Sequence, residues 1–251
     1  MIYVTGDIHG DPRRLSKSAF PEQEAMGRDD YVIILGDFGL VWDYHGESVD
    51  EKYWLDWLEN KPFTTLFVDG NHECFDRLYR EYKTEEWNGG MTRVIRPHVR
   101  HLMRGEYFTL NDCTFWAFGG ARSHDIRDGI LDPVKDKIKI KIWQDDYTKF
   151  FRIDGQSWWK EEMPTLAEMN HGKEILKSHN STVDFVLTHD CPASIKRIIS
   201  SGYHKPNELN IFLETISKEV NFNCWLYGHN HMNRKDLSKF IGLFEQIVRI
   251  V

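Results

Sequence analysis

The sequence has few cysteines and no surplus of positive charge, and each shortage excludes a class of protein. Only four cysteines occur among 251 residues, and no two of them form a C-x-x-C pair. We therefore expect neither a cysteine-based zinc site nor a disulfide framework. We expect the protein to reside in a reducing compartment. The formal net charge of −7 argues against a broad nucleic-acid-binding surface, because such a surface neutralises phosphates with many lysines and arginines.

Long hydrophobic runs are also missing. No apolar stretch approaches the length of a membrane span, and residues 1–5 lead directly into Gly6 and Asp7, which leaves no room for a secretory signal. We therefore expect a cytoplasmic protein without a membrane partner. A chain of 251 residues with 41% hydrophobic residues can bury a sizeable core, and we expect a single domain over residues 1–251.

Short apolar runs recur along the chain, and each predicts a buried strand: 2–5, 31–35, 64–68, 114–118, 183–187 and 224–227. Helical patterns lie between several of them, at 49–60, 75–82 and 207–220, and the spacing of Thr165 and Glu168 predicts a further helix start. This alternation indicates an α/β fold. Residues 100–120 differ, because two extended segments meet at Asn111-Asp112 without a helix between them. Some pairing should therefore be antiparallel, either within one mixed sheet or in two sheets packed face to face.

Residues 125–160 have a pattern of their own. The run KIKIKIW at 137–143 alternates strictly, and together with residues 147–153 it predicts a charged, partly exposed hairpin insertion. We interpret this insertion as a surface hairpin that extends a sheet. A lid over the functional site and a dimer contact are the alternatives.

Polar residues follow five of the six predicted strands, and they are the candidate site: Asp7, His9, Asp37, Asn71, His72, His189, His229 and His231. Taken singly, each could be a turn residue or a hydrogen-bonded core histidine. In open α/β sheets, however, ligands bind beside the carboxyl ends of the strands, so these residues should converge on one crevice. Oxygen and imidazole donors without thiolate suit Mn, Fe, Zn or Ni.

Eight candidate positions exceed what one ion needs, which favours a two-metal site with a bridging carboxylate. Two divalent ions would give an acidic protein a local trap for anions, and a water or hydroxide that they share would be a nucleophile toward phosphorus. The predicted substrate is therefore a phosphorylated small molecule or another phosphoester.

Five short blocks occur in order between residues 6 and 231: GDIHG, GDFG, GNHE, the histidine of THDCP, and GHNH. Together they resemble the signature blocks of the calcineurin-like metallophosphoesterases, which are dinuclear phosphoesterases. The resemblance implies a four-layer sandwich of two mixed β-sheets flanked by helices. It also implies two divalent metal ions, with Mn expected first and Fe, Zn, Ni or Mg as alternatives.

The resemblance also implies a role for each residue. One metal would be held by Asp7, His9 and His231, and the other by Asn71, His189 and His229, with Asp37 bridging the two; His72 would be the general acid that protonates the leaving oxygen. The implied activity is hydrolysis of phosphomonoesters or phosphodiesters. The alternative is a non-catalytic scaffold with the same fold that binds a partner.

The second block departs from that of the family's protein phosphatases, which continue it as GD-x-x-DRG. Here the text is GDFGLVWD, so the phosphate-binding arginine is missing from that place. We predict Arg122, in FGGARSHD, as the substrate-binding replacement, with Arg77 and Arg127 as weaker candidates; a solvated loop arginine is the alternative for Arg122. His45 and His124 are minor candidates for the border of the crevice.

Overall fold

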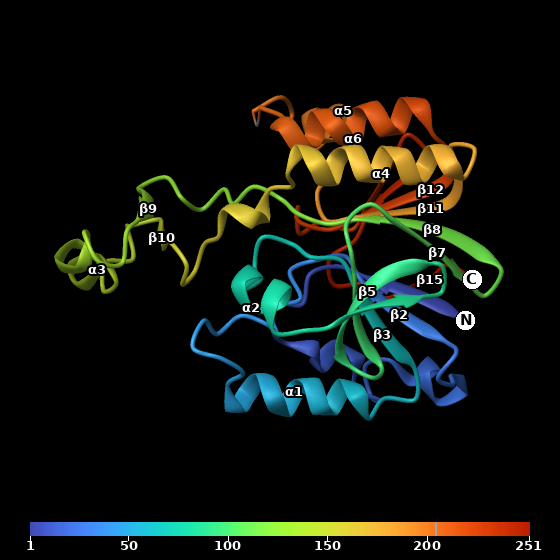
Figure 1. Ribbon diagram of the computed structural model, residues 1–251, viewed down its shortest axis with the longest axis horizontal. Helices are drawn as coiled ribbons and strands as arrows, with labels where there is room; N and C mark the ends of the chain where they lie inside the picture. Colours follow the sequence, from blue (N-terminus) through green and yellow to red (C-terminus); the bar gives the residue numbers. More distant parts are fainter. Residues whose placement is uncertain (204) are drawn as a thin grey trace.

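The computed structural model describes residues 1–203 and 205–251, which form two large mixed sheets packed face to face between layers of helices (Figure 1). The four-layer α/β sandwich expected from the sequence is confirmed. The helices are α1 (Val49–Glu59), α2 (Phe75–Arg80), α3 (Lys137–Trp143), α4 (Leu166–Ser178), α5 (Ala193–Ile199) and α6 (Glu208–Glu219), with 3₁₀ turns η1 (Pro12–Leu15), η2 (Pro21–Ala25) and η3 (Lys160–Glu162).

The first sheet has seven strands, in the order β15 (Val248–Arg249), β1 (Ile2–Thr5), β2 (Tyr31–Ile34), β3 (Thr64–Phe67), β6 (Val99–Leu102), β5 (Gly90–Arg96) and β4 (Thr84–Trp87). Strands β1, β2, β3 and β6 run parallel, whereas β15, β5 and β4 pair antiparallel with their neighbours. Because β1, β2 and β3 are parallel and nearly in register, the loops that follow them leave the sheet at the same edge.

The second sheet has six strands, in the order β13 (Arg234–Asp236), β14 (Phe240–Gly242), β12 (Asn221–Tyr227), β11 (Thr182–Thr188), β8 (Cys113–Phe118) and β7 (Glu106–Leu110). Strands β14, β12, β11 and β8 are parallel. As predicted, β7 and β8 are antiparallel and turn at Asn111-Asp112, where both residues have positive φ (49° and 61°), as a tight hairpin with the right-handed twist requires.

The apolar runs are continuous because strands β1, β2 and β3 of the first sheet are buried on both faces. On β1, Ile2 and Val4 face the core between the sheets, whereas Tyr3 packs on the outer side with Leu55 and Leu58 of α1. The helices α4, α5 and α6 cover the outer face of the second sheet (Figure 1). Burial on two faces leaves little freedom to shift a strand by one residue, so the strand ends are held firmly.

Residues 124–158 form an arm that extends away from the sandwich (Figure 1). The predicted hairpin in this arm is wrong: residues 137–143 form helix α3, and β10 (Phe151–Ile153) pairs with β9 (Gly129–Leu131) in parallel, not antiparallel. The alternating pattern suits a strand only where a neighbouring strand supplies hydrogen bonds. Without one, a helix satisfies its own backbone, and Ile138 and Ile142 remain 79% and 65% exposed.

Two further expectations can be compared with the helices. Thr165 and Glu168 form the predicted capping box at the start of α4. Within the described part of the chain, each helix is too short or too polar to traverse a lipid bilayer.

Candidate metal centre

The predicted polar residues meet where the carboxyl ends of strands from both sheets come together. Asp7 and His9 follow β1, Asp37 follows β2, and Asn71 and His72 follow β3 of the first sheet. His189 follows β11 and the pair His229 and His231 follows β12 of the second sheet. The site therefore draws on five strands, and the facing sheets bring its two halves together.

Four of these residues adopt the left-handed backbone conformation, which side chains other than glycine rarely occupy: His9 (φ 45°), Asp37 (45°), His229 (60°) and His231 (47°). Such a conformation costs about 1 kcal/mol or more per residue, and it persists where the surrounding structure imposes it. Strain concentrated on four potential ligands is typical of a functional site.

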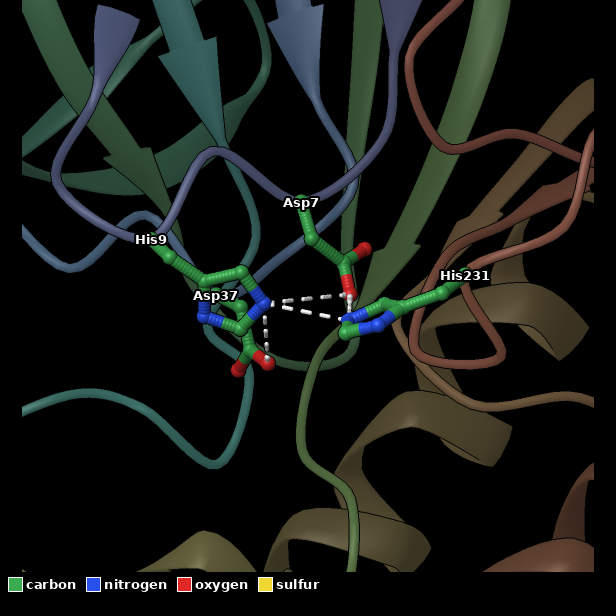
Figure 2. Close-up of side chains that lie close together, drawn as sticks. All are labelled: Asp7, His9, Asp37 and His231. Carbon is green, nitrogen blue, oxygen red and sulfur yellow. Dashed lines mark hydrogen bonds and ion pairs between the residues drawn. The ribbon is translucent and has the colours of Figure 1, made fainter.

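The first group of potential ligands is Asp7, His9, Asp37 and His231, whose side chains point toward one another in Figure 2. His231 Nε2 lies 3.1 Å from Asp7 Oδ2 and 3.1 Å from His9 Nε2, and His9 Nε2 is 3.8 Å from Asp37 Oδ2. One atom from each residue lies within 4.8 Å of the others, which is close enough for all four to contact a single cation.

The second group consists of Asp37, His189 and His229, all of them buried. His189 Nδ1 donates a hydrogen bond to the carbonyl oxygen of Leu35 at 2.6 Å, which leaves Nε2 as the lone-pair nitrogen. That Nε2 is 3.2 Å from Asp37 Oδ1. Asp37 thus belongs to both groups, in the position of a bridging carboxylate.

Backbone groups fix the Asp37 carboxylate. Its Oδ1 accepts hydrogen bonds from the backbone N–H groups of Asn71 and His72, each at 2.8 Å. The neighbouring glycine permits this approach, because a Cβ on Gly70 would lie 2.1 Å from Asp37 Oδ1. Likewise, a Cβ on Gly36 would lie 2.2 Å from His189 Nδ1. Gly36 and Gly70 are therefore required by close packing against His189 and Asp37.

Three buried atoms of the site make no hydrogen bond among the described residues: Asp7 Oδ2, Asn71 Oδ1 and His189 Nε2. Asp7 Oδ2 and His189 Nε2 do have close polar neighbours, His231 Nε2 at 3.1 Å and Asp37 Oδ1 at 3.2 Å. A buried polar atom without a partner costs about 1–3 kcal/mol. All three atoms are lone-pair donors of the kind that divalent cations bind. The residues present therefore fit a metal centre, and Asn71 Oδ1 is an oxygen of the kind that such a centre could use.

The pKa values of the buried histidines follow from their surroundings. Burial, opposed only partly by Asp190, lowers the pKa of His229 to about 3, so its imidazole is neutral and able to bind a cation. For His189, burial also acts to lower the pKa, but Asp37 and Asp7 outweigh it and raise the pKa above the usual value. A divalent cation shared with those carboxylates would favour the neutral imidazole instead.

His72 lies beside the metal-binding groups and belongs to neither. Its ring stacks on Trp42 at 5.5 Å between ring centroids and meets the His9 ring edge-on at 4.8 Å. Its Nε2 is 4.0 Å from Asp37 Oδ2, and its side chain is 25% exposed. Burial lowers the pKa of His72, and Asp37 opposes this shift only in part. A phosphate dianion beside the ring would also oppose it and would favour the protonated ring.

Arg122 lies on the wall of a cavity of about 480 Å³ that His229 and His231 also line. Its side chain is 50% exposed and pairs with Glu208 at 2.7 Å. His124 lines the same cavity, with its ring 5.5 Å from that of His229, whereas His45 is exposed and lies against Tyr44.

The two weaker arginine candidates lie in other surroundings. Arg77 is buried and pairs with Glu51 and Glu81 at 2.8 and 3.0 Å, and Arg127 donates to the carbonyl oxygen of Thr148 on the arm. Neither lines the cavity beside His229, and a structural role accounts for both.

Several residues around the site were not predicted. Glu73 is buried and accepts hydrogen bonds from the backbone N–H groups of Phe38 and Gly39, which hold the loop after β2. Ser123 contacts Asn71 on one side and Glu162 on the other. Glu73 belongs to the block GNHE, directly after His72, and its place in that motif could have identified it. Glu162 follows Asn71 by 91 positions, and no local pattern points to it.

Comparison with known proteins agrees with this geometry. A search of curated proteins found no match to the chain. The family model described as calcineurin-like phosphoesterase matches residues 1–233. That family binds divalent metals at a dinuclear site and acts on phosphoesters, and the two groups of histidine and aspartate ligands described above are of the kind such a site requires. Because the match spans nearly the whole chain, this protein belongs to the calcineurin-like phosphoesterase family.

Proposed function

We propose that this protein hydrolyses phosphate esters with two divalent metal ions, acting as a phosphomonoesterase or phosphodiesterase. The observation that carries the proposal is the position of Asp37, which is shared by the two ligand groups and has a carboxylate fixed by two backbone N–H donors. A carboxylate so placed can bridge a pair of ions.

Under this proposal each ion has its own ligands. Asp7, His9 and His231 would hold one ion, and Asn71, His189 and His229 the other, with Asp37 on both. Asn71 Oδ1 and His189 Nε2, which make no hydrogen bond in the described part of the chain, support the second set. When bound, the ions would supply Lewis acidity and activate water for attack on phosphorus. Mn is the metal we expect first, since the donors are oxygen and nitrogen; Fe, Zn, Ni and Mg are the alternatives.

Side chains of the protein would bind the substrate and donate the proton. His72, held by Trp42 next to the two ligand groups, would bind the phosphate as an imidazolium and donate its proton to the leaving oxygen, which leaves the neutral imidazole. Arg122, on the cavity wall, would contact a phosphate oxygen once substrate displaces its ion pair with Glu208. The substrate would be a small phosphorylated molecule whose body lies in the cavity of about 480 Å³.

The organisation of the whole chain is part of the proposal. We propose that residues 1–251 act as one domain in the cytoplasm. All four cysteines, which lie in the described part of the chain, are free thiols, as is usual in a reducing compartment.

The test combines metal content with turnover. Purified protein should bind two equivalents of Mn²⁺ and hydrolyse 4-nitrophenyl phosphate, bis(4-nitrophenyl) phosphate or both, and the ratio of the two rates assigns the monoester or diester preference. A folded protein that binds Mn²⁺ at neither group and turns over neither substrate would instead support the non-catalytic scaffold.

A further inference from the structure

The cavity beside the metal centre extends well beyond the ligands. It runs from His229 and His231 to the end of α5 and the start of α6, where it is lined by Lys196, Lys205 and Asn207. Its volume of about 480 Å³ lies in the range of small-molecule sites and exceeds what one phosphate group needs. The far end has room for another part of a substrate.

Two lysines, Lys196 and Lys205, line the far wall although the protein is acidic overall. Lys196 Nζ lies 3.0 Å from Asp190 Oδ1 and 3.0 Å from Asn230 Oδ1, so its charge is balanced within the wall. Lys205 is exposed, and among the residues that the structure describes no carboxylate lies within ion-pair distance of it. The first turn of α6 is capped by the Asn207 side chain and carries Glu208, the partner of Arg122, so Lys205 is the cation on this wall whose charge is not balanced by a described residue.

We propose that this far end binds a second anionic group of the substrate, so that the substrate class is a small molecule with a phosphoester at one end and a second phosphate or a carboxylate at the other. The inference rests on the proposed function. Beside an uncharged substrate, the exposed Lys205 ammonium would contact only water. A second anionic group of the substrate would form a charge-assisted hydrogen bond with it.

Two matched pairs of substrates test this proposal: fructose 1-phosphate with fructose 1,6-bisphosphate, and adenosine 3′-phosphate with adenosine 3′,5′-bisphosphate. In at least one pair, the bisphosphate should have a kcat/KM about tenfold higher, as expected for one charge-assisted contact. Lys205→Gln should abolish that ratio. Lys177→Gln, which removes an exposed lysine on α4, should preserve it.

Equal kcat/KM values within both pairs would overturn the inference, and so would an unchanged ratio in Lys205→Gln. Turnover of the monophosphates tests the proposed function separately. Phosphate release without a preference for the bisphosphates would remove only the anionic subsite. If neither the four compounds nor 4-nitrophenyl phosphate released phosphate, the proposed function itself would be wrong.

A second inference comes from a different set of contacts, around Asn71. Ser123 Oγ lies 3.4 Å from Asn71 Nδ2 and 2.6 Å from Glu162 Oε2, and the Ser123 backbone N–H donates to Glu162 Oε1 at 3.0 Å. All three side chains are buried, with exposed fractions of 2–6%. Glu162 ends the 3₁₀ turn that follows the arm.

The direction of these hydrogen bonds matters. An ionised Glu162 only accepts, so the Ser123 hydroxyl must donate to it and can then only accept from Asn71. The Asn71 amide must therefore present its Nδ2 to Ser123, which leaves its Oδ1, buried and without a hydrogen bond to residues 1–203 and 205–251, free for a metal ion. We infer that Ser123 and Glu162 are positioning residues that fix the orientation of a metal-binding amide.

The test measures metal affinity rather than turnover. Ser123→Ala should weaken the binding of one of two Mn²⁺ ions about tenfold in a calorimetric titration, as is typical when the group that orients a ligand is lost. The other Mn²⁺ affinity and the thermal midpoint of the metal-free protein should stay close to wild type. In the Asn71→Asp background, where the two oxygens are equivalent, Ser123→Ala should have little further effect.

Equal weakening of both ions by Ser123→Ala would indicate general damage and overturn the inference. An equally large loss in the Asn71→Asp background would do so too, because a carboxylate has no wrong orientation.

Discussion

Replacing His72 by alanine separates proton donation from metal binding. The structure places His72 Nε2 4.0 Å from Asp37 Oδ2, in contact range of the site and outside both ligand groups. Removing the ring therefore leaves all seven proposed ligands in place. A positioned general acid contributes about 10²–10⁴-fold, equivalent to about 3–5 kcal/mol of transition-state stabilisation.

The size of the effect should depend on the leaving group. An alkyl phosphate releases a strongly basic alkoxide that needs a proton, so the kcat of the His72→Ala variant should fall by at least about 100-fold on glycerol phosphate. A nitrophenolate leaves without help, and the loss on 4-nitrophenyl phosphate should stay below about tenfold. Bound Mn²⁺, measured by elemental analysis, should remain at the wild-type level.

The matched control is His45→Ala, which removes an exposed loop histidine. It should match wild type on both substrates. Equal losses on the two substrates in His72→Ala would refute the role as an acid. Loss of Mn²⁺ from this variant comparable to that from Asp37→Asn would refute the separation of roles.

Three further predictions follow from the site and the core. Asp37→Asn should lose both Mn²⁺ ions, because the bridging charge is removed, and elemental analysis would detect the loss; retention of either ion at full affinity would contradict bridging. Gly70→Ala should also lose metal, since its Cβ would lie 2.1 Å from Asp37 Oδ1, whereas Gly27→Ala, with nothing within 4 Å, should change the free energy of unfolding by less than about 0.5 kcal/mol. The buried Lys61 has its pKa lowered by burial to about 8 from 10.5. The folded protein therefore loses this proton between pH 8 and 10.5 while the unfolded chain retains it, and stability relative to Lys61→Met should rise over that range in urea unfolding. A constant difference would refute this.

Much of the fold was readable because strands buried on two faces leave continuous apolar runs. The residues after those runs were readable for the same reason, since the end of each strand marks the position of Asp37, Asn71 or His189. The failure at 137–143 has the opposite cause: an alternating pattern predicts a strand only where a partner strand exists, and the arm supplies none there.

The contacts behind the ligands were out of reach for another reason. Ser123 and Glu162 are 39 positions apart, and Asn71 lies 52 positions before Ser123. Their encounter depends on how the arm leaves and rejoins the sandwich, which no local spacing encodes. The stacking of Trp42 on His72 is similar, because it requires the loops after β2 and β3 to fold onto each other.

The arm departs from and rejoins the sandwich at neighbouring points. The backbone N–H of Ala121 donates to the carbonyl oxygen of Glu162 at 3.1 Å, so the chain entering the excursion and the chain leaving it are already fastened together. Closing a longer excursion between two fixed points adds only about 0.6 kcal/mol for each doubling of its length. A foreign polypeptide, such as a fluorescent reporter, can therefore be inserted in the outer part of the arm, near α3, without moving the fastened base where Ser123 contacts Asn71 and Glu162.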